Sequence, residues 1–122
     1  MANDPADLVS AYYEILQAGA DSYDPQRLRL ILAPDLDFEG PIAGRIRGAD
    51  RFTRGVAGFI QTHRGIRFLQ QVITPDAAAV LYDADLPRGT LRFAEFFRFG
   101  SGKITSIKLL YDPGRYTAFG GR

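Results

Sequence analysis

A segment near the carboxyl end of the sequence places one carboxylate among aromatic and aliphatic side chains. Residues 90–99 follow the turn signal Pro87-Arg88-Gly89 and are rich in strand-forming residues, which predicts a β-strand. Because strand side chains alternate between faces, one face of this strand carries Leu91, Phe93, Glu95, Phe97 and Phe99. Burial penalises the ionised form of a carboxyl, so we expect the pKa of Glu95 to exceed its ordinary value of about 4.3. A carboxylic acid held in this way is a candidate general acid or hydrogen-bond donor. A bulge that turns Glu95 to solvent, or an ion pair with an arginine, is the alternative.

Tyrosine and histidine supply the other groups that could do chemistry. Tyr82 and Tyr111 fall on the apolar faces of two further predicted strands, and Tyr13 lies at the edge of the apolar stripe of the first predicted helix. Their hydroxyls could donate to a developing oxyanion, although each tyrosine also suits an ordinary core position. His63 ends the stripe of the third predicted helix. Its side chain titrates near neutrality and is a candidate base, and a histidine packed at the core margin is the other interpretation.

Helical and strand signals divide the chain into two halves. Asp-Pro pairs at residues 4–5 and 24–25 predict two helix starts, with ends near Gly19 and Pro34, and a third helix is expected at residues 50–64. After Gly65 the apolar period shortens to two, which predicts strands at 66–73, 77–86, 90–99 and 103–112. A strand is also expected at 35–42, with a turn and a short extended piece at 43–48. The pattern predicts one α+β domain over residues 1–122, with three N-terminal helices on a curved, mostly antiparallel sheet.

Composition excludes several classes of function. The 122 residues include no Cys and one His, so thiolate sites and multi-histidine metal sites within one chain are ruled out, and we expect no metal and no cofactor. The net charge of +1 argues against nucleic-acid binding. We therefore interpret the arginines of 45–67 as a solvated face or a subunit contact, and the acids of 35–39 as a solvated edge. Residues 1–5 lack a secretory signal and no apolar run could span a bilayer, so we expect a cytoplasmic protein without a membrane partner.

The order of elements resembles the cone-shaped fold of nuclear transport factor 2 (NTF2), which SnoaL-like polyketide cyclases, ketosteroid isomerases and limonene epoxide hydrolases share. The similarity covers nearly the whole chain and rests on four stretches of sequence. These are Leu32-Ala33-Pro34-Asp35 leading into Phe38-Glu39-Gly40-Pro41, then Gly48-Ala49-Asp50-Arg51-Phe52, Gly102-Lys103-Ile104 and Tyr111-Asp112-Pro113. Such motifs indicate a fold and leave the activity open.

The resemblance implies roles for individual positions. Ketosteroid isomerases carry an aspartate base just before a proline of the first strand, and the matching residue here is Gly40. Their helix-1 tyrosine and protonated strand aspartate resemble Tyr13 and Glu95, and Tyr111 resembles an aromatic pocket wall. The catalytic aspartate of the epoxide hydrolases corresponds to Leu109, which cannot act.

Two functions follow from these observations. The first is a cofactor-independent enzyme of the isomerase or cyclase type acting on a hydrophobic small molecule, with Glu95 as acid, Tyr13 assisting, and His63 or a water as base. The residues expected to bind its substrate are Phe38, Phe59, Tyr82, Phe93, Phe97 and Tyr111. The second is a non-catalytic ligand-binding or dimerisation domain. In either case Phe96 and Leu110, on the outer faces of their strands, predict a homodimer.

Overall fold

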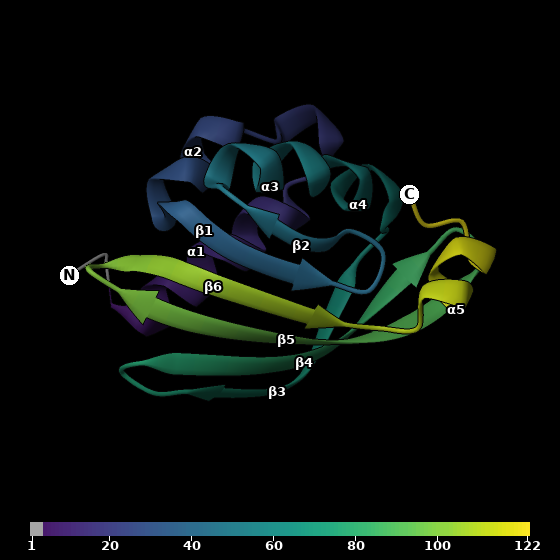
Figure 1. Cartoon of the computed structure of the whole chain (residues 1–122). Helices are drawn as coiled ribbons and strands as arrows, with labels where there is room; N and C mark the ends of the chain where they lie inside the picture. Colours follow the sequence, from purple (N-terminus) through teal and green to yellow (C-terminus); the bar gives the residue numbers. More distant parts are fainter. Residues whose placement is uncertain (1–3) are drawn as a thin grey trace.

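Helices dominate the first half of the chain and strands the second in the structure, a computed structural model that describes residues 4–122 (Figure 1). Residues 1–3 lie outside the described residues, so the expectation that residues 1–5 lack a secretory signal falls largely outside them as well. The helices of the first half are α1 (Pro5–Gln17), the 3-10 helix η1 (Ala20–Ser22), α2 (Pro25–Ile31), α3 (Ala49–Gly55) and α4 (Ala57–Thr62). The strands are β1 (Leu32–Gly40), β2 (Gly44–Arg47), β3 (Ile66–Ile73), β4 (Ala77–Leu86), β5 (Gly89–Gly100) and β6 (Lys103–Leu110), and α5 (Pro113–Ala118) follows them.

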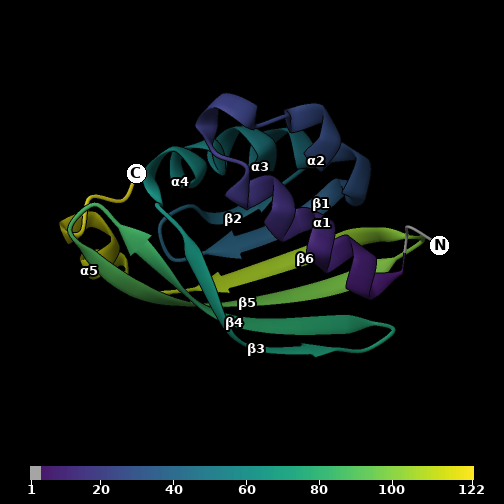
Figure 2. The ribbon, with the colours of Figure 1, turned by 180° about the vertical axis from the view of Figure 1, so that it is seen from behind.

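The six strands form one mixed sheet in the order β2-β1-β6-β5-β4-β3. Only the pairing of β1 with β6 is parallel, and the other neighbours are antiparallel. The sheet curves, and α1 to α4 lie on its concave side, with α1 in front of β5 and β6 when seen from behind (Figures 1 and 2). This arrangement confirms the predicted α+β architecture. No helix within residues 4–122 has the length and apolarity to cross a membrane.

The helix starts follow the predicted capping signals. The carboxylate of Asp4 accepts a hydrogen bond from the Asp7 amide at the start of α1, and that of Asp24 accepts one from the Gln26 amide at the start of α2. A side-chain acceptor of this kind satisfies one of the free amides of the first turn. The helix expected at 50–64 is interrupted at Val56 and forms the separate helices α3 and α4.

One helix was missed. Residues 113–118 form α5, which starts with the same Asp-Pro signal as α1 and α2, and Asp112 caps it by accepting from the Arg115 amide. The strand predicted over 103–112 therefore ends at Leu110. The helix turns the chain back across one end of the sheet (Figure 1), and Tyr116 of α5 becomes part of the core.

Strand alternation places most side chains correctly. The predicted inner face of β4 is buried throughout, and Leu91, Phe93, Glu95 and Phe97 of β5 are buried as predicted. Strict alternation back from Tyr111, which was predicted on the apolar face, would place Ile104 on the outer face, but Ile104 is fully buried. The reason is a bulge: Arg98 pairs with Ser106 and Phe99 with Ile104, so Thr105 has no partner and the alternation of β6 shifts there.

Candidate active site

A cavity of about 260 Å³ lies between the helices and the concave face of the sheet. Every layer of the fold contributes to its wall, from α1 through the sheet to the residues after β6. The aromatic lining residues are Tyr12, Phe38, Phe52, Phe59, Tyr82, Phe93, Tyr111 and Tyr116. The others are Leu16, Ile42, Ala43, Ile46, Gly55, Val56, Glu95, Leu109 and Arg122. A cavity lined this way suits an apolar ligand with very few polar anchor points.

Glu95 lies at the wall of this cavity with 1% of its surface exposed. The hydroxyl of Tyr12 donates to Glu95 Oε2 and that of Tyr13 donates to Oε1, each at 2.7 Å. Glu95 pairs in register with Val80 of β4 on one side and with Leu109 of β6 on the other. The carboxyl therefore faces the interior without a bulge, and its partners are phenols instead of an arginine.

The two tyrosines approach the carboxyl from different sides because neighbouring residues of a helix lie about 100° apart. Their rings meet edge to face, with centroids 5.0 Å apart. Tyr12 lines the cavity, whereas Tyr13 lines a separate crevice between α1 and β3 that Phe68 also borders. Only Tyr12 is therefore in a position to share Glu95 with a ligand in the cavity.

Burial controls the protonation of this cluster. Loss of solvation raises the pKa of Glu95 to about 7, although the hydrogen bonds from Tyr13 and Tyr12 offset part of the rise by stabilising the carboxylate. Burial and the nearby Glu95 charge raise the pKa of Tyr12, Tyr13 and Tyr82 well above the ordinary tyrosine value. At neutral pH the phenols consequently stay protonated, and the carboxyl can either take or give a proton.

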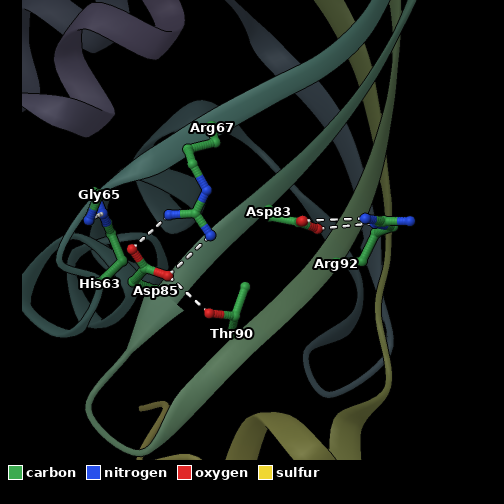
Figure 3. Close-up of polar contacts among 7 residues, drawn as sticks. All are labelled: His63, Gly65, Arg67, Asp83, Asp85, Thr90 and Arg92. Atoms are coloured by element: carbon green, nitrogen blue, oxygen red, sulfur yellow. Dashed lines mark hydrogen bonds and ion pairs between the residues drawn. The ribbon is translucent and has the colours of Figure 1, made fainter.

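His63 lies at the margin of the core, which is the second of the two interpretations that its position in the sequence allowed. Its Nε2 lies 2.8 Å from the Leu16 carbonyl oxygen, and its Nδ1 accepts from the Gly65 amide at 3.2 Å. Figure 3 shows the contact with Gly65. Because Nδ1 acts as an acceptor, Nε2 carries the proton and donates to Leu16. The ring also stacks on Phe59 and is not among the lining residues. With both nitrogens engaged, His63 joins α1 to the connection between α4 and β3, and the geometry gives no support to its expected role as a base.

The other predicted site residues divide into two groups. The cavity brings together Phe38, Phe59, Tyr82, Phe93 and Tyr111 with Glu95. Phe97 is buried but does not line the cavity, because its ring packs against Tyr12 and Tyr13, with centroids 5.2 and 6.1 Å away. It supports the tyrosines that hold Glu95 and does not meet a ligand.

Three aromatic lining residues escaped the sequence analysis. Tyr12 lies in the middle of the apolar stripe of α1, a position that indicates core packing and gives no sign of a carboxyl partner. Phe52 belongs to the stripe of α3 for the same reason. Tyr116 lies in α5, and the Asp112-Pro113 signal before it could have identified that helix. None of the three has a signal that distinguishes cavity from core.

The position expected for a base in the first strand also faces this region. Gly40 shares the face of Phe38, and a Cβ added to it would lie 3.0 Å from Phe38 Cζ. It supplies no side chain, and Leu109, the other position considered, is apolar. Across residues 4–122, no group of three or more His, Asp or Glu side chains is arranged to hold a metal ion.

Comparisons with known proteins agree with this architecture. The SnoaL-like domain family matches residues 9–107. A protein from Kribbella flavida DSM 17836 is 23% identical with a TM-score of 0.81, over 94% of this chain and 92% of that one. A steroid delta-isomerase from Pseudomonas aeruginosa is 18% identical with a TM-score of 0.74, over 97% and 93%. An NTF2-like protein from Cytophaga hutchinsonii ATCC 33406 is 18% identical with a TM-score of 0.72, over 92% and 93%. No curated protein matches the sequence. At these identities the structural likeness concerns the fold.

Proposed function

The chain belongs to the SnoaL-like domain family, and we propose that it is an isomerase-type enzyme in which Glu95 moves a proton within a hydrophobic small molecule. The observation that carries this proposal is the Glu95 carboxyl itself. It is buried at a cavity wall, bound by Tyr12 and Tyr13, and has a pKa of about 7. A carboxyl with a pKa near the working pH serves equally well as base and as acid.

The reaction that fits this group begins with the Glu95 carboxylate. It takes a proton from a carbon next to a substrate carbonyl, which leaves an enolate and the neutral Glu95 acid. The same acid then returns the proton to another carbon, so no proton, electron or atom is gained or lost overall. Tyr82 and Tyr111 line the same cavity, and their hydroxyls are the donors available to orient the substrate oxygen and stabilise the enolate.

A single proton-transferring group favours isomerisation over reactions that need a separate acid and base. Among the described residues that line the cavity, Glu95 has the one side-chain carboxylate, Gly40 has no side chain, and both nitrogens of His63 are engaged. In an aldol-type cyclisation the neutral Glu95 acid would have to return its proton to the new alkoxide oxygen, which lies further from the carbon that lost the proton than the receiving carbon of an isomerisation does. The cavity wall offers no second side-chain carboxyl and no imidazole within the part of the chain that the structure describes.

The proposal can be tested with 2-tetralone, a two-ring ketone with acidic C–H bonds next to its carbonyl. Exchange of these hydrogens in deuterium oxide is followed by NMR with and without protein. We expect the protein to accelerate exchange and Glu95→Gln to lower that acceleration at least 100-fold, in line with the usual worth of a general base. Glu39→Gln, the same chemical change at an exposed position of β1, is the matched control and should exchange at the wild-type rate. Equal rates for wild type and Glu95→Gln would contradict the proposal.

Ligand binding without catalysis is the second candidate. It is favoured by the same shortage of proton-transferring groups at the cavity wall. This function requires that 2-tetralone binds equally well to wild type and to Glu95→Gln while neither protein accelerates exchange.

We further propose that the outer face of the sheet forms a homodimer. Phe96 and Leu110 are 44% and 60% exposed there. Figure 3 shows the ion pairs between Asp83 and Arg92 and between Arg67 and Asp85, with Thr90 donating to Asp85. By strand alternation these polar side chains belong to the same outer face as Phe96. Polar side chains around an apolar centre are typical of protein interfaces.

Light scattering at micromolar concentrations tests the dimer. We expect a dimer for the wild type and a monomer for Phe96→Asp, with unchanged circular dichroism as the check on folding. A monomeric wild type would contradict this assembly.

A further inference from the structure

We propose that the ligand of the cavity is a neutral carbonyl compound of about ten non-hydrogen atoms with one or two rings, and that four-ring ketones do not fit. This inference rests on the proposed function of the same site. It concerns the size and polarity of the substrate, which neither the family nor the chemistry of Glu95 determines. Three observations carry it: the volume of the cavity, the packing of its aromatic walls and the position of its charged groups.

The volume limits the number of atoms. A dry cavity of about 150 Å³ holds benzene with its six carbons, which corresponds to about 25 Å³ for each non-hydrogen atom. At this density the cavity of about 260 Å³ accepts about ten such atoms. A four-ring ketone with about twenty non-hydrogen atoms would need roughly twice that volume.

The walls resist enlargement because the rings that form them brace one another. Tyr82 stacks on Phe93 with centroids 5.2 Å apart and an interplanar angle of 9°, and Phe93 in turn contacts Tyr111 at 5.1 Å. On another part of the wall Phe38 packs on Phe52 with centroids 5.0 Å apart. Four of these five rings are buried, and rotating any of them would require its neighbours to move as well.

The charged groups determine the polarity of the ligand. Glu95 is buried at the wall, so a ligand carboxylate beside it would place two negative charges in a site with little water. Arg122, the other charged lining residue, is exposed to solvent. The part of the ligand that meets Glu95 is therefore neutral. A carbonyl compound meets this requirement, since it is neutral and its carbonyl group acidifies the adjacent C–H bond that faces Glu95.

Calorimetric titration of the full chain with two ketones tests the size limit. We expect 2-tetralone to bind at least tenfold more tightly than androst-4-ene-3,17-dione, a four-ring ketone. Val56→Phe, which adds a ring at the cavity wall, should weaken 2-tetralone binding at least tenfold. Val72→Phe, the same change at an exposed position of β3, should bind as the wild type does. Both variants are measured for binding alone, without an activity assay, and circular dichroism checks that they fold.

The possible results separate this inference from the proposed function. Binding of the four-ring ketone as tight as that of 2-tetralone, or no binding of either, overturns the size limit. Wild-type affinity of a folded Val56→Phe also overturns it, because the ligand would then lie elsewhere. If 2-tetralone binds more tightly than the four-ring ketone but the protein does not accelerate exchange of its hydrogens, the size limit is supported and the proposed isomerase activity is contradicted.

Discussion

Replacing Glu95 by glutamine should change how the stability of the protein depends on pH. The carboxyl has a pKa of about 7 in the folded protein, against 4.5 without the surrounding structure. Below about pH 4.5 it is protonated in both the folded and the unfolded chain. Between about pH 4.5 and 7 the folded protein keeps the proton that the unfolded chain has released. Above about pH 7 both are ionised.

The size of the effect follows from the interval between these two values. Where the folded state binds one more proton than the unfolded state, the free energy of unfolding falls by about 1.36 kcal/mol for each pH unit. Across an interval from 4.5 to about 7, Glu95 therefore removes about 3 kcal/mol of stability as the pH rises. The amide introduced by Glu95→Gln is neutral throughout, so the variant should gain this amount relative to the wild type over the same interval. The NH2 group of this amide takes the place of a carboxylate oxygen that accepted a hydrogen bond. This replacement changes the free energy of unfolding by an amount that does not depend on pH.

Urea denaturation from pH 4 to 8.5, followed by circular dichroism, measures the difference between Glu95→Gln and the wild type. Taking the difference cancels the titrations that both proteins share. Glu39→Gln, measured in the same way, should show no comparable rise over this interval because its side chain is exposed. A stability difference for Glu95→Gln that stays flat, or that falls as the pH rises, would refute the reasoning that burial dominates at Glu95.

Three further predictions concern residues around the cavity. Tyr13→Phe removes a hydrogen bond that stabilises the carboxylate, so the pKa of Glu95 should rise further, and an unchanged or lower value in a carbon-13 NMR titration would contradict this. Phe97→Ala should lower the free energy of unfolding in urea by about 3–5 kcal/mol and leave 2-tetralone affinity unchanged, since Phe97 packs outside the cavity lining; weaker binding by the folded variant would place Phe97 at the ligand. In Gly121→Ala the new Cβ would lie 2.3 Å from Tyr116 Cε2, so amide hydrogen exchange over residues 113–122 should accelerate, and unchanged protection would show that the ring can move aside.

Local signals predicted the elements well where one residue type dominates the local conformation. The Asp-Pro pairs before α1 and α2 act within a single helical turn, and the alternation of β4 and β5 reflects one buried and one outer face. Prediction failed where a distant partner changes the pattern. The bulge at Thr105 follows from how β6 pairs with β5, and nothing in the residues around it signals the shift.

The candidate site also combines a part that local signals predicted with a part that depends on distant partners. Alternation identified Glu95 and the buried face around it, because which side of a strand a residue takes is a local property. The partners of Glu95 are 82 and 83 residues away in the sequence. No spacing rule links residues so far apart, which is why Tyr12 was missed as a site residue and why helix spacing made Tyr13 a candidate donor without pairing it with Glu95.

The sequence by itself determined the absence of thiols, the small number of titratable groups near neutrality and the presence of one carboxylate on an aromatic strand face. These are properties of composition and of a two-residue period, which need no knowledge of the fold. The tertiary structure decided that two phenols hold this carboxylate, that only one of them faces the cavity, and that His63 is bound through both nitrogens. Those relations depend on how α1 lies over the sheet, and the free energy of that packing comes from contacts between segments that are remote in the chain.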